Sequence, residues 1–463
     1  MSFDNRYPEN WDVRFFEELF SEPTRNGLTR PKKVRGSGIK MVNMGEIFAF
    51  DRIYNQDMAR VPVSEKEYHN YILKKGDLLF ARQSLTLEGA GKCSIIMTNE
   101  EKTFESHIIR VRLDVSKADP MFYYYLFKSR IGKELISSIV EQVAAAGIRG
   151  SDLVKLKLPY PEIVEQKNIV LILSSLDDKI ELNNAINKNL EEMAQALFKR
   201  WFVDFEFPNE NGEPYKSSGG EFEESELGLI PKGWSVGTFQ DLISDIVGGD
   251  WGKEAPQGNY TKEVSCIRGA DIPEITKGLL GKVPKRFILP KNATAKSLSH
   301  GDIIIEISGG SPTQSTGRSV LIIEEVLNKF NTPLICTNFC RVIKPIIGYS
   351  EFLYCYLSYL YNEDVFFQYE NGTTGIKNLD IGSLFSVHKI VIPIKSVLQQ
   401  YSAQYQAVYS TIQHLGRESD QLAQIRDTLL PKLMSGEIRV PVEQEHSAPE
   451  LPMVAESSAI YQP

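Results

Sequence analysis

The sequence contains few cysteines and no long run of apolar residues. Its 463 residues include five cysteines, and no two of them form a Cys-x-x-Cys pair. Reduced thiols therefore fit better than a disulfide framework, and Cys336 and Cys340 have no further His or Cys at ligand spacing, so no metal site is expected. No segment approaches the roughly 18 apolar residues of a membrane span, and the polar N-terminus lacks a signal-peptide core. We expect a cytoplasmic protein.

Motifs that carry catalysis are also missing. Gly91-Lys92 is followed by Cys93 rather than Ser or Thr, so a phosphate-binding P-loop is absent. The Asn/Asp-Pro-Pro-Tyr string of amino-methyltransferases, a strand-linked Gly-x-Gly-x-x-Gly and a His-Glu-x-x-His are absent too. The nearest approach to a nuclease motif is Asp302-x-x-x-Glu306-x-Ser308, which has Ser where a metal-dependent nuclease would need Lys. These absences favour a binding protein without catalytic residues over an enzyme.

The formal charge of −8 argues at first against a nucleic-acid ligand, because 52 basic residues stand against 60 acidic ones. The acidic residues are unevenly placed, however. Residues 204–226 hold eight acidic residues and one basic residue, and residues 441–463 hold four acidic residues and no basic one. Residues 1–160 carry a balance of +4, and residues 231–395 carry one of +1. Charge therefore does not exclude nucleic acid as a ligand of these two regions.

The same two regions repeat each other in sequence. Residues 40–47 align with residues 265–272 at an offset of 225, and the same offset places Asp77 on Asp302. In this alignment Ala81 matches Glu306, so the second acid is not shared, and we interpret Glu306 as a solvated or binding residue. Further matches join His107-Ile108-Ile109-Arg110-Val111 to Asn338-Phe339-Cys340-Arg341-Val342 and Gly147-Ile148-Arg149 to Gly375-Ile376-Lys377.

A long helical pattern follows each copy of the repeat. Apolar residues recur at alternating spacings of four and three, which is the period of a coiled-coil seam, and the second copy lies at a constant offset of 232. We predict two long helices that pack on each other, rather than single amphipathic helices on a core. The first, residues 166–201, would be about 54 Å long. The predicted seam consists of Ile169, Leu173, Leu176, Ile180, Asn183, Asn187, Leu190, Leu197, Tyr405, Val408, Ile412, Leu415, Leu422 and Leu429.

The resulting domain order is a repeat and a helix, used twice. Each repeat mixes short β-rich runs with a helical pattern, at residues 120–140 and 350–369, which indicates an α+β fold. The predicted boundaries are residues 1–163 for the first repeat, 164–205 for the first helix, 206–230 for an acidic linker, 231–396 for the second repeat, 397–436 for the second helix and 437–463 for a disordered tail.

Several strings that span nearly the whole chain resemble the specificity subunits of type I restriction-modification systems. They are Leu158-Pro159-x-Pro161 with Gln166-Lys167-x-Ile169, Ala196-Leu197-Phe198-Lys199-Arg200-Trp201-Phe202-Val203-Asp204-Phe205, Leu227-Gly228-x-Ile230-Pro231-x-Gly233-Trp234, and Arg426-Asp427-x-Leu429-Leu430-Pro431-Lys432-Leu433-Met434-Ser435-Gly436-Glu437-Ile438.

The resemblance implies two α+β target-recognition domains, each of which reads one half of a split sequence in double-stranded DNA. It also implies that the two helices pack antiparallel, as a spacer with pseudo-two-fold symmetry. Methylation and cleavage would belong to partners, namely two modification subunits that bind the helices and two restriction subunits. S-adenosylmethionine, ATP and Mg would be bound by those partners, with no cofactor in this chain. Half-sites one DNA turn apart need about 34 Å between reading centres, which a helix of about 54 Å can span.

Candidate DNA contacts combine cations that position phosphates with side chains that read base edges. Residues 25–40 carry six basic residues and no acidic one. The loops that begin at Arg82 and Ser308 hold the same place in the repeat but differ in sequence, as loops reading different half-sites should, although ordinary surface loops also diverge. Trp251 lies between two glycines and could be exposed or part of a core. The predicted contacts are Arg30, Lys32, Lys33, Arg35, Asn43, Arg82, Gln83, Ser84 and Arg149 in the first repeat, and Trp251, Arg268, Ser308, Ser311, Thr313, Gln314, Arg318, Lys377 and Asn378 in the second.

Two other classes of function stay open at this point. The chain could be a nuclease or methyltransferase with an unrecognised active site, or a scaffold whose helix pair organises proteins without contacting DNA. Activity of the purified chain alone would support the first alternative, and protection of a split DNA site would exclude the second.

Overall fold

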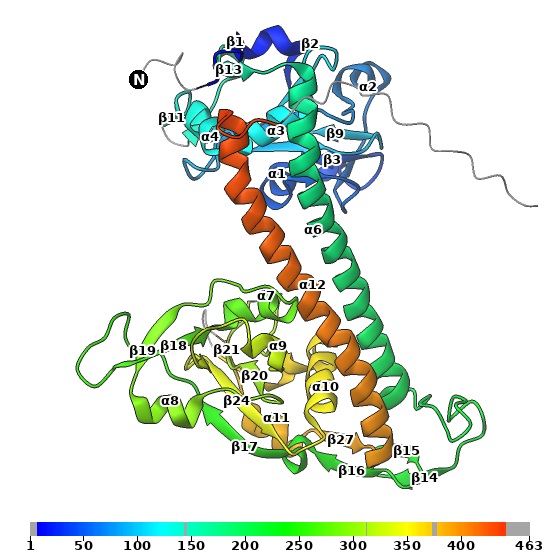
Figure 1. Cartoon of the computed structure of the whole chain (residues 1–463). Helices are drawn as coiled ribbons and strands as arrows, with labels where there is room; N and C mark the ends of the chain where they lie inside the picture. Colours follow the sequence, from blue (N-terminus) through cyan, green and yellow to red (C-terminus); the bar gives the residue numbers. More distant parts are fainter. Residues whose placement is uncertain (1–6, 143–145, 312, 373–376, 441–463) are drawn as a thin grey trace, which may run out of the picture. The chain divides into compact units, whose positions relative to one another are not determined.

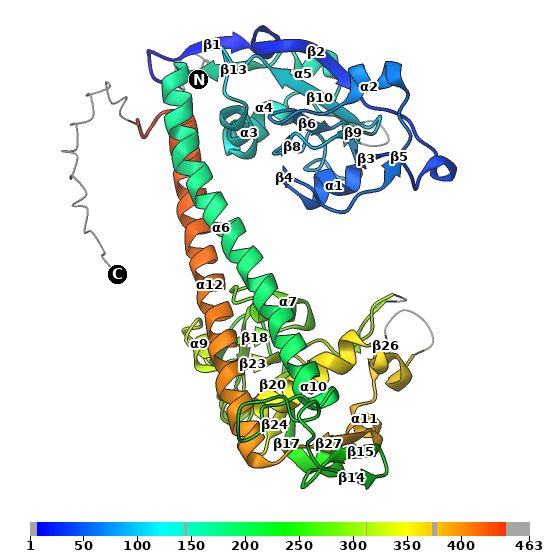
Figure 2. The ribbon, with the colours of Figure 1, turned by 90° about the vertical axis from the view of Figure 1, so that its right-hand side faces the viewer.

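The computed structural model describes residues 7–142, 146–311, 313–372 and 377–440. The chain divides into two compact units (Figures 1 and 2). Unit 1 combines Met1–Asp177 with Ile425–Pro463, and unit 2 is Asp178–Gln424. Each unit therefore contains one sequence repeat and a part of each long helix.

Unit 1 is built around a five-stranded sheet in the order β2-β10-β6-β8-β4. These strands are β2 (Phe20–Asn26), β10 (Ile108–Leu113), β6 (Leu78–Ala81), β8 (Cys93–Ile96) and β4 (Arg52–Ile53). The smaller sheets contain β5 (Arg60–Val61), β3 (Ile39–Val42) and β9 (Lys102–Phe104); β11 (Glu141–Gln142), β12 (Ala146–Gly147) and β7 (Gln83–Ser84); and β1 (Asp12–Phe15) with β13 (Lys157–Tyr160). The helices are η2 (Phe16–Leu19), η3 (Lys32–Val34), α1 (Met44–Ala49), α2 (Glu65–Tyr71), α3 (Pro120–Lys128), α4 (Arg130–Ser137) and α5 (Gly150–Leu153).

Unit 2 has a four-stranded central sheet in the order β17-β24-β20-β22. These strands are β17 (Ile243–Gly248), β24 (Cys340–Pro345), β20 (Ile303–Glu306) and β22 (Ser319–Leu321). The smaller sheets contain β19 (Lys285–Ile288), β18 (Lys262–Ile267) and β23 (Leu334–Cys336); β21 (Ser308–Gly309), β26 (Lys377–Leu379) and β25 (Glu370–Asn371); β16 (Ser235–Thr238) with β27 (Lys389–Ile392); and β14 (Phe222–Ser225) with β15 (Gly228–Pro231). The helices are η5 (Phe239–Leu242), η6 (Gly269–Asp271), α7 (Ile272–Thr276), α8 (Pro290–Lys296), α9 (Glu324–Leu327), α10 (Ser350–Asn362), η7 (Val365–Tyr369) and α11 (Ile381–Val387).

The two units share one α+β topology, as the sequence repeat predicts. Strands β10 and β6 pair antiparallel in unit 1 and β24 and β20 do so in unit 2, while β3/β9 and β18/β23 are equivalent parallel pairs. The turn before the central strand is also the same. Gly76 and Gly301 have φ angles of 91° and 88°, a region that glycine enters without strain. Asp77 and Asp302 each accept a hydrogen bond of 2.8 Å from the backbone N–H three residues earlier.

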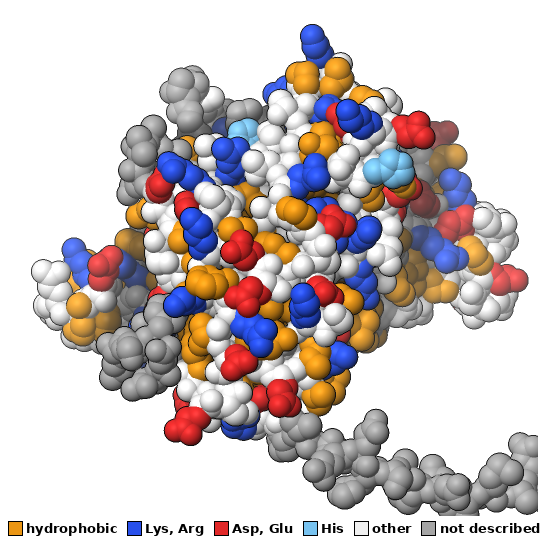
Figure 3. Space-filling model, turned by 90° about the horizontal axis from the view of Figure 1, so that it is seen from above, with side chains coloured by type: hydrophobic (Ala, Val, Ile, Leu, Met, Phe, Trp, Pro, Cys, Tyr) orange, Lys and Arg blue, Asp and Glu red, His pale blue; other side chains and the backbone are white. Residues whose placement is uncertain are grey.

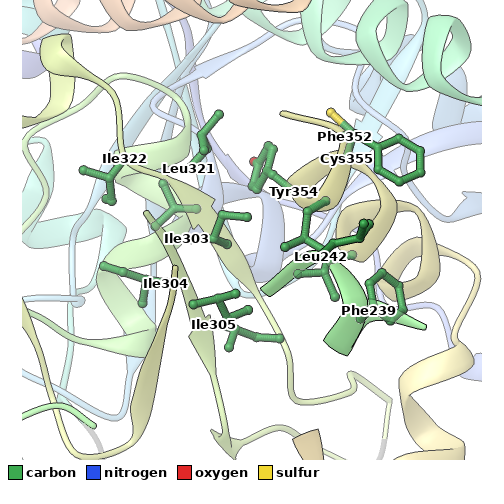
Figure 4. Close-up of a cluster of buried hydrophobic side chains, with 14 of the residues drawn as sticks. Phe239, Leu242, Ile303, Ile304, Ile305, Leu321, Ile322, Phe352, Tyr354 and Cys355 are labelled. Carbon is green, nitrogen blue, oxygen red and sulfur yellow. The ribbon is translucent and has the colours of Figure 1, made fainter. Parts of the chain in front are cut away.

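The core of unit 2 lies between the central sheet and α10. Strand β20 is buried along its whole length, which suits its unbroken run of isoleucines. In Figure 4, Ile303 and Leu321 from the sheet, Tyr354 from α10 and Phe239 from η5 belong to one apolar cluster. The equivalent core of unit 1 contains Phe80 from β6 together with residues of α3. The sheets are therefore rigid supports for the loops that leave their ends.

The two long helices are α6 (Ile163–Phe198), which continues as the π-helical turn η4 (Lys199–Val203), and α12 (Lys395–Ser435). In unit 2 the Asn183 amide donates to the hydroxyl of Ser419 at 3.3 Å and the Asn187 amide donates to the carbonyl of Ile412 at 3.3 Å. The partner number falls as the residue number rises, so the helices run antiparallel. Every predicted seam residue is buried or half-buried. Buried polar groups of this kind fix the register of a helix pair.

Three segments differ from the sequence-based prediction. The helix predicted at 120–140 is two helices, because Ser129 caps α4 by accepting a hydrogen bond from Gly132. The helix predicted at 350–369 ends at Asn362, before Asp364 adopts a positive φ of 58°. The segment predicted as a linker contains the hairpin of β14 and β15. The predicted disordered tail lies outside the described residues from 441 onwards.

Candidate nucleic-acid interface

In unit 1, segments that carry predicted contact residues leave one end of the central sheet. Strand β6 ends at Ala81, which lies opposite Ile108, the first residue of β10. Strand β2 ends at Asn26, which pairs with Ile109. The segments that begin at Gly27 and Arg82 therefore leave the sheet from the same end. We call this end, with the loops that leave it, the loop end of the unit.

Unit 2 has the same arrangement. Strand β20 ends at Glu306 opposite Cys340, the first residue of β24, and β17 ends at Gly248 opposite Arg341. The loops that carry Trp251 and residues 307–318 therefore leave from one end of this sheet too. In both units the parallel strand β3 or β18 also finishes near this end, where Asn43 and Arg268 follow.

A small sheet brings together two segments that the sequence marked separately. In unit 1, Gln83 pairs with Gly147 and Ser84 with Ala146. In unit 2, Ser308 pairs with Asn378 and Gly309 with Lys377. The loop after the central strand is thus joined to the loop before α5 or α11 in the same way in both units.

The register of this sheet corrects one alignment. Ile148 N–H donates to the carbonyl of Arg82 at 3.0 Å, and Leu379 N–H donates to that of Ile307 at 3.0 Å. Ile148 is therefore the counterpart of Leu379, and Arg149, the N-cap of α5, matches Asp380, the N-cap of α11. Matching Arg149 with Lys377 was wrong, because the hydrogen bonds give an offset of 231 here, whereas that match needs an offset of 228. Residues 375 and 376 of the predicted match lie outside the described residues.

The loops before the parallel strands are also equivalent, although their sequences do not align. A Cβ on Gly27 would lie 2.1 Å from the carbonyl oxygen of Phe104, and one on Gly249 would lie 2.0 Å from that of Thr337. Both glycines thus allow the chain to pass closely over the end of a neighbouring strand, β9 or β23. The basic loop of unit 1 and the loop of Trp251 in unit 2 start from these two glycines.

The cationic side chains of residues 25–40, which we call the basic loop, differ in whether they are already bound to other groups of the protein. Arg30 donates to Glu67 at 2.7 Å, and this hydrogen bond lowers the pKa of Glu67 to about 2. Arg35 donates to the carbonyl of Arg30 and is half-buried. Lys32 and Lys33 are exposed on η3. These two lysines are therefore the cations of this loop best placed to meet a phosphate.

Several predicted contacts also hold local structure. Asn43 caps α1, and its amide donates to the carbonyl of Met41 at 2.9 Å. Arg268 makes two hydrogen bonds of 2.8 Å to Asp271, which raise the pKa of Arg268. Lys377 pairs with Glu370 at 2.7 Å, and Arg149 with Glu141 at 2.6 Å. These four side chains are oriented by their neighbours.

Glu306 is buried and is paired with Arg318, at the other end of the 307–318 loop. It is 3% exposed, and Arg318 donates to both of its carboxylate oxygens, at 2.9 and 2.6 Å. The hydrogen bonds that Arg318 donates to Glu306 raise the pKa of Arg318. A Cβ on Gly309 would lie 2.7 Å from the same carboxylate. The solvated interpretation of Glu306 is therefore wrong, because the carboxylate fixes both ends of the 307–318 loop.

The side chains left at the surface of the two loop ends are mostly polar. Gln83, Thr313, Gln314 and Asn378 are exposed, and the Gln314 amide donates to the hydroxyl of Tyr361 at 3.1 Å. Ser84, Ser308 and Ser311 are half-buried beside them, as is Arg82. Amides of this kind can pair with base edges. Over the face of the molecule that Figure 3 shows, basic and acidic side chains are interspersed, and neither sign of charge predominates.

The titratable groups do not form a metal-binding cluster within the described residues. No group of three His, Cys, Asp or Glu there could hold a metal ion. All five cysteines are buried, and burial raises the pKa of the thiols of Cys266 and Cys340 to about 12. No helix in the described ranges has the length and hydrophobicity to cross a membrane.

The protein thus has two related units, each with a loop end that carries predicted contact residues, and a long antiparallel helix pair. Residues 8–192 match the family of the type I restriction modification DNA specificity domain. The chain is 26% identical over 442 residues to the MjaIX specificity subunit of Methanocaldococcus jannaschii, covering 94% of this chain and 95% of that one. It is 23% identical to the HindI specificity subunit of Haemophilus influenzae, covering 79% and 87%.

A solved structure shares the fold over nearly the whole chain. The S subunit of a type I restriction-modification system from M. genitalium superposes with a TM-score of 0.56 at 16% identity, covering 94% of this chain and 98% of that one. Residues 8–192 therefore match the DNA specificity domain of type I restriction modification, and nearly the whole chain is similar to specificity subunits of such systems.

Proposed function

We propose that this chain recognises a split sequence in double-stranded DNA, with the loop end of each unit reading one half. The observation that carries the proposal is that one sheet topology is used twice while the loops at its end differ. Gln83-Ser84 in unit 1 and Ser308-Gly309 in unit 2 hold the same hydrogen-bonded position with different side chains. A repeated support with different contact groups is what reading two different half-sites requires.

The exposed groups divide into two tasks. Lys32 and Lys33 would contact phosphates, which gives affinity without sequence information. Gln83 in unit 1, with Gln314 and Asn378 in unit 2, would meet base edges, where amides pair bidentately with adenine. The predicted contacts at Arg82, Arg149, Arg318 and Lys377 would act as oriented cations near the DNA backbone.

The helix pair would serve as spacer and as docking platform for the modification subunits. Asn183 donates to Glu418 at 2.8 Å and Asn187 to the carbonyl of Lys277 at 3.1 Å, so the register of α6 is held both by α12 and by the body of unit 2. A fixed register would make the gap in the DNA site depend on helix length. With 36 residues, α6 is about 54 Å long.

The chemistry would belong to partner subunits. Two modification subunits would bind S-adenosylmethionine, and two restriction subunits would bind ATP and Mg. This chain would contribute the recognition of the DNA sequence. We place the complex in the cytoplasm, where the DNA of the cell is accessible.

DNA protection by the assembled complex tests the proposal. The chain is purified with its modification subunits and footprinted on a duplex that carries the site. Two protected blocks separated by unspecified bases are expected, and scrambling either block should abolish tight binding. Methylation or cleavage by the purified chain alone would instead reveal an enzyme, and a complete lack of protection would leave a scaffold.

A further inference from the structure

Trp251 lies at the loop end of unit 2 and is held in place from several directions. It is 37% exposed, whereas the other three tryptophans of the chain, Trp11, Trp201 and Trp234, are 5% exposed or less. It belongs to the loop between β17 and β18, which extends from the body of unit 2 (Figure 1). A large aromatic side chain exposed among candidate DNA contacts needs a physical explanation.

Arg286 of β19 fixes the ring. Its guanidinium carbon lies 4.1 Å from the ring centroid of Trp251, and its Nε donates to the backbone carbonyl of the same residue at 3.0 Å. The side chain of Arg286 is 8% exposed and also pairs with Glu254 at 3.2 Å. A buried cation thus covers one face of the indole, so the surface open to a ligand is the opposite face and the ring edge.

The backbone on both sides of Trp251 is equally constrained. Gly252 has a φ of 59°, and a Cβ there would lie 2.2 Å from the carbonyl oxygen of Phe287. Lys253 and Phe287 exchange two backbone hydrogen bonds of 2.9 Å. Asp250 accepts from Asn292 at 2.7 Å and from the N–H of Gly252 at 3.2 Å. The ring is therefore presented by a rigid turn rather than by a loose loop.

The position of this turn indicates what its ligand is. It starts from Gly249, the counterpart of Gly27, and so holds the place of the loop that presents Lys32 and Lys33 in unit 1. A second aromatic residue of the same loop, Tyr260, lies 5.7 Å from the ammonium of Lys253. Aromatic faces beside cations hold the bases and adjoining phosphates of single strands, and in a duplex apolar side chains reach base faces at steps that are partly unstacked.

We propose that Trp251 is a preorganised stacking platform for a nucleobase at a partly unstacked step in the half-site of unit 2, and that Arg286 is the positioning residue that holds it. The inference rests on the function proposed above and names a contact for one half of the site only. In unit 1 the equivalent loop presents lysines to the corresponding stretch of the other half-site. The two halves would therefore differ in kind of contact as well as in sequence.

Fluorine NMR can follow Trp251 in the assembled complex. The chain is labelled with 5-fluorotryptophan and assembled with unlabelled modification subunits, so that only its four tryptophans give signals. The Trp251 signal is assigned with Trp251→Phe. A duplex carrying the split site should shift this signal and leave the three buried ones in place. A duplex with the second half scrambled should leave the Trp251 signal unshifted as well.

Binding measurements supply the second readout. We expect Trp251→Ala to weaken binding of the intact site about tenfold, which corresponds to about 1.4 kcal/mol. Trp251→Phe should recover part of this loss. Arg286→Met, which keeps the apolar stem, should weaken binding several-fold and shift the Trp251 signal in the free complex. Ile347→Ala is the matched control, because Ile347 is an exposed apolar residue that follows β24 at the opposite end of the same sheet.

The outcomes separate this inference from the proposed function. A complex that discriminates the intact from the scrambled site while the Trp251 signal stays fixed overturns the platform and leaves the function standing. Loss of the shift when thymines are replaced by uracils also overturns stacking, because the contact would then be to a thymine methyl group. A complex that discriminates no duplex at all overturns the proposed function itself.

Discussion

Arg426 on α12 donates a hydrogen bond of 2.7 Å to Asp177 on α6, within unit 1. Asp177 is 8% exposed and also accepts from the hydroxyl of Tyr125 at 2.7 Å, with Arg52 at 3.5 Å. The carboxylate therefore compensates two cations that enter from different elements. Removing it would take the ion pair with Asp177 from Arg52, whose side chain is buried at 3% exposed.

We expect Asp177→Ala to lower the free energy of unfolding by about 3 kcal/mol, as measured by denaturant titration. The matched control is Asp12→Ala, because the Asp12–Arg14 pair is exposed and should contribute less than about 1 kcal/mol. Equal losses from the two variants would show that the pair on the helices has no special role.

Lys32 and Lys33 should strengthen DNA binding through phosphates. Replacing both with Ala should weaken binding to all sequences, and the slope of log K against log salt should fall by about 2. Lys74→Ala with Lys75→Ala is the control, since these exposed lysines precede β6, at the far end of the same sheet. An unchanged salt slope in the Lys32/Lys33 variant would remove this loop from the interface.

Lys329 should make the stability of the chain depend on pH. Burial lowers the pKa of Lys329 from 10.5 to about 8, while its ammonium donates to Gly278 and Gln413. Between these pH values the unfolded chain binds the extra proton, so this residue adds stability as pH rises from 8 to 10.5. The free energy of unfolding should rise over this range by on the order of 2 kcal/mol more than in Lys329→Met. Parallel curves for the two proteins would contradict the shifted pKa.

Helix length should set the gap in the DNA site. One heptad inserted into α6 between Asp177 and Asn183, with another in α12 between Ser419 and Arg426, keeps both sets of contacts in phase. The insertion adds about 10 Å to each helix. We expect the unspecified gap to lengthen while the two half-sites keep their sequence, as read from protection of a randomised DNA library. A gap of the original length would remove the spacer role.

Patterns local in sequence predicted most of the fold. The sequence predicted the turns at Asp77 and Asp302 because the same Gly-Asp pair recurs in both repeats. It predicted the helical seam because apolar residues recur at a short, regular spacing. The burial of Asp177 could not, since the seam pattern favoured its neighbour Leu176, and the partners of Asp177 come from distant elements. Tertiary contacts override local pattern at such points.

The sequence predicted which segments form the candidate site, but it did not predict how the strands that carry these segments pair with one another. The candidate contact loops were predicted from their place in the repeat. The pairing of Glu306 with Arg318 and that of Trp251 with Arg286 depend on strands that meet only in the folded chain. The mismatch of Arg149 with Lys377 arose because loop insertions change the offset between repeats. Hydrogen-bond register settles such offsets, and sequence similarity does not.

The methylation pattern of a genome that expresses this chain with its modification subunits tests most directly whether each unit reads its own half-site. The account predicts a split motif that disappears when the chain is deleted. Gln314→Ala in unit 2 should relax the motif in one half, and Gln83→Ala in unit 1 should relax it in the other, each by about 1–3 kcal/mol of discrimination. An unsplit motif, or one in which either substitution alters both halves alike, would contradict the account.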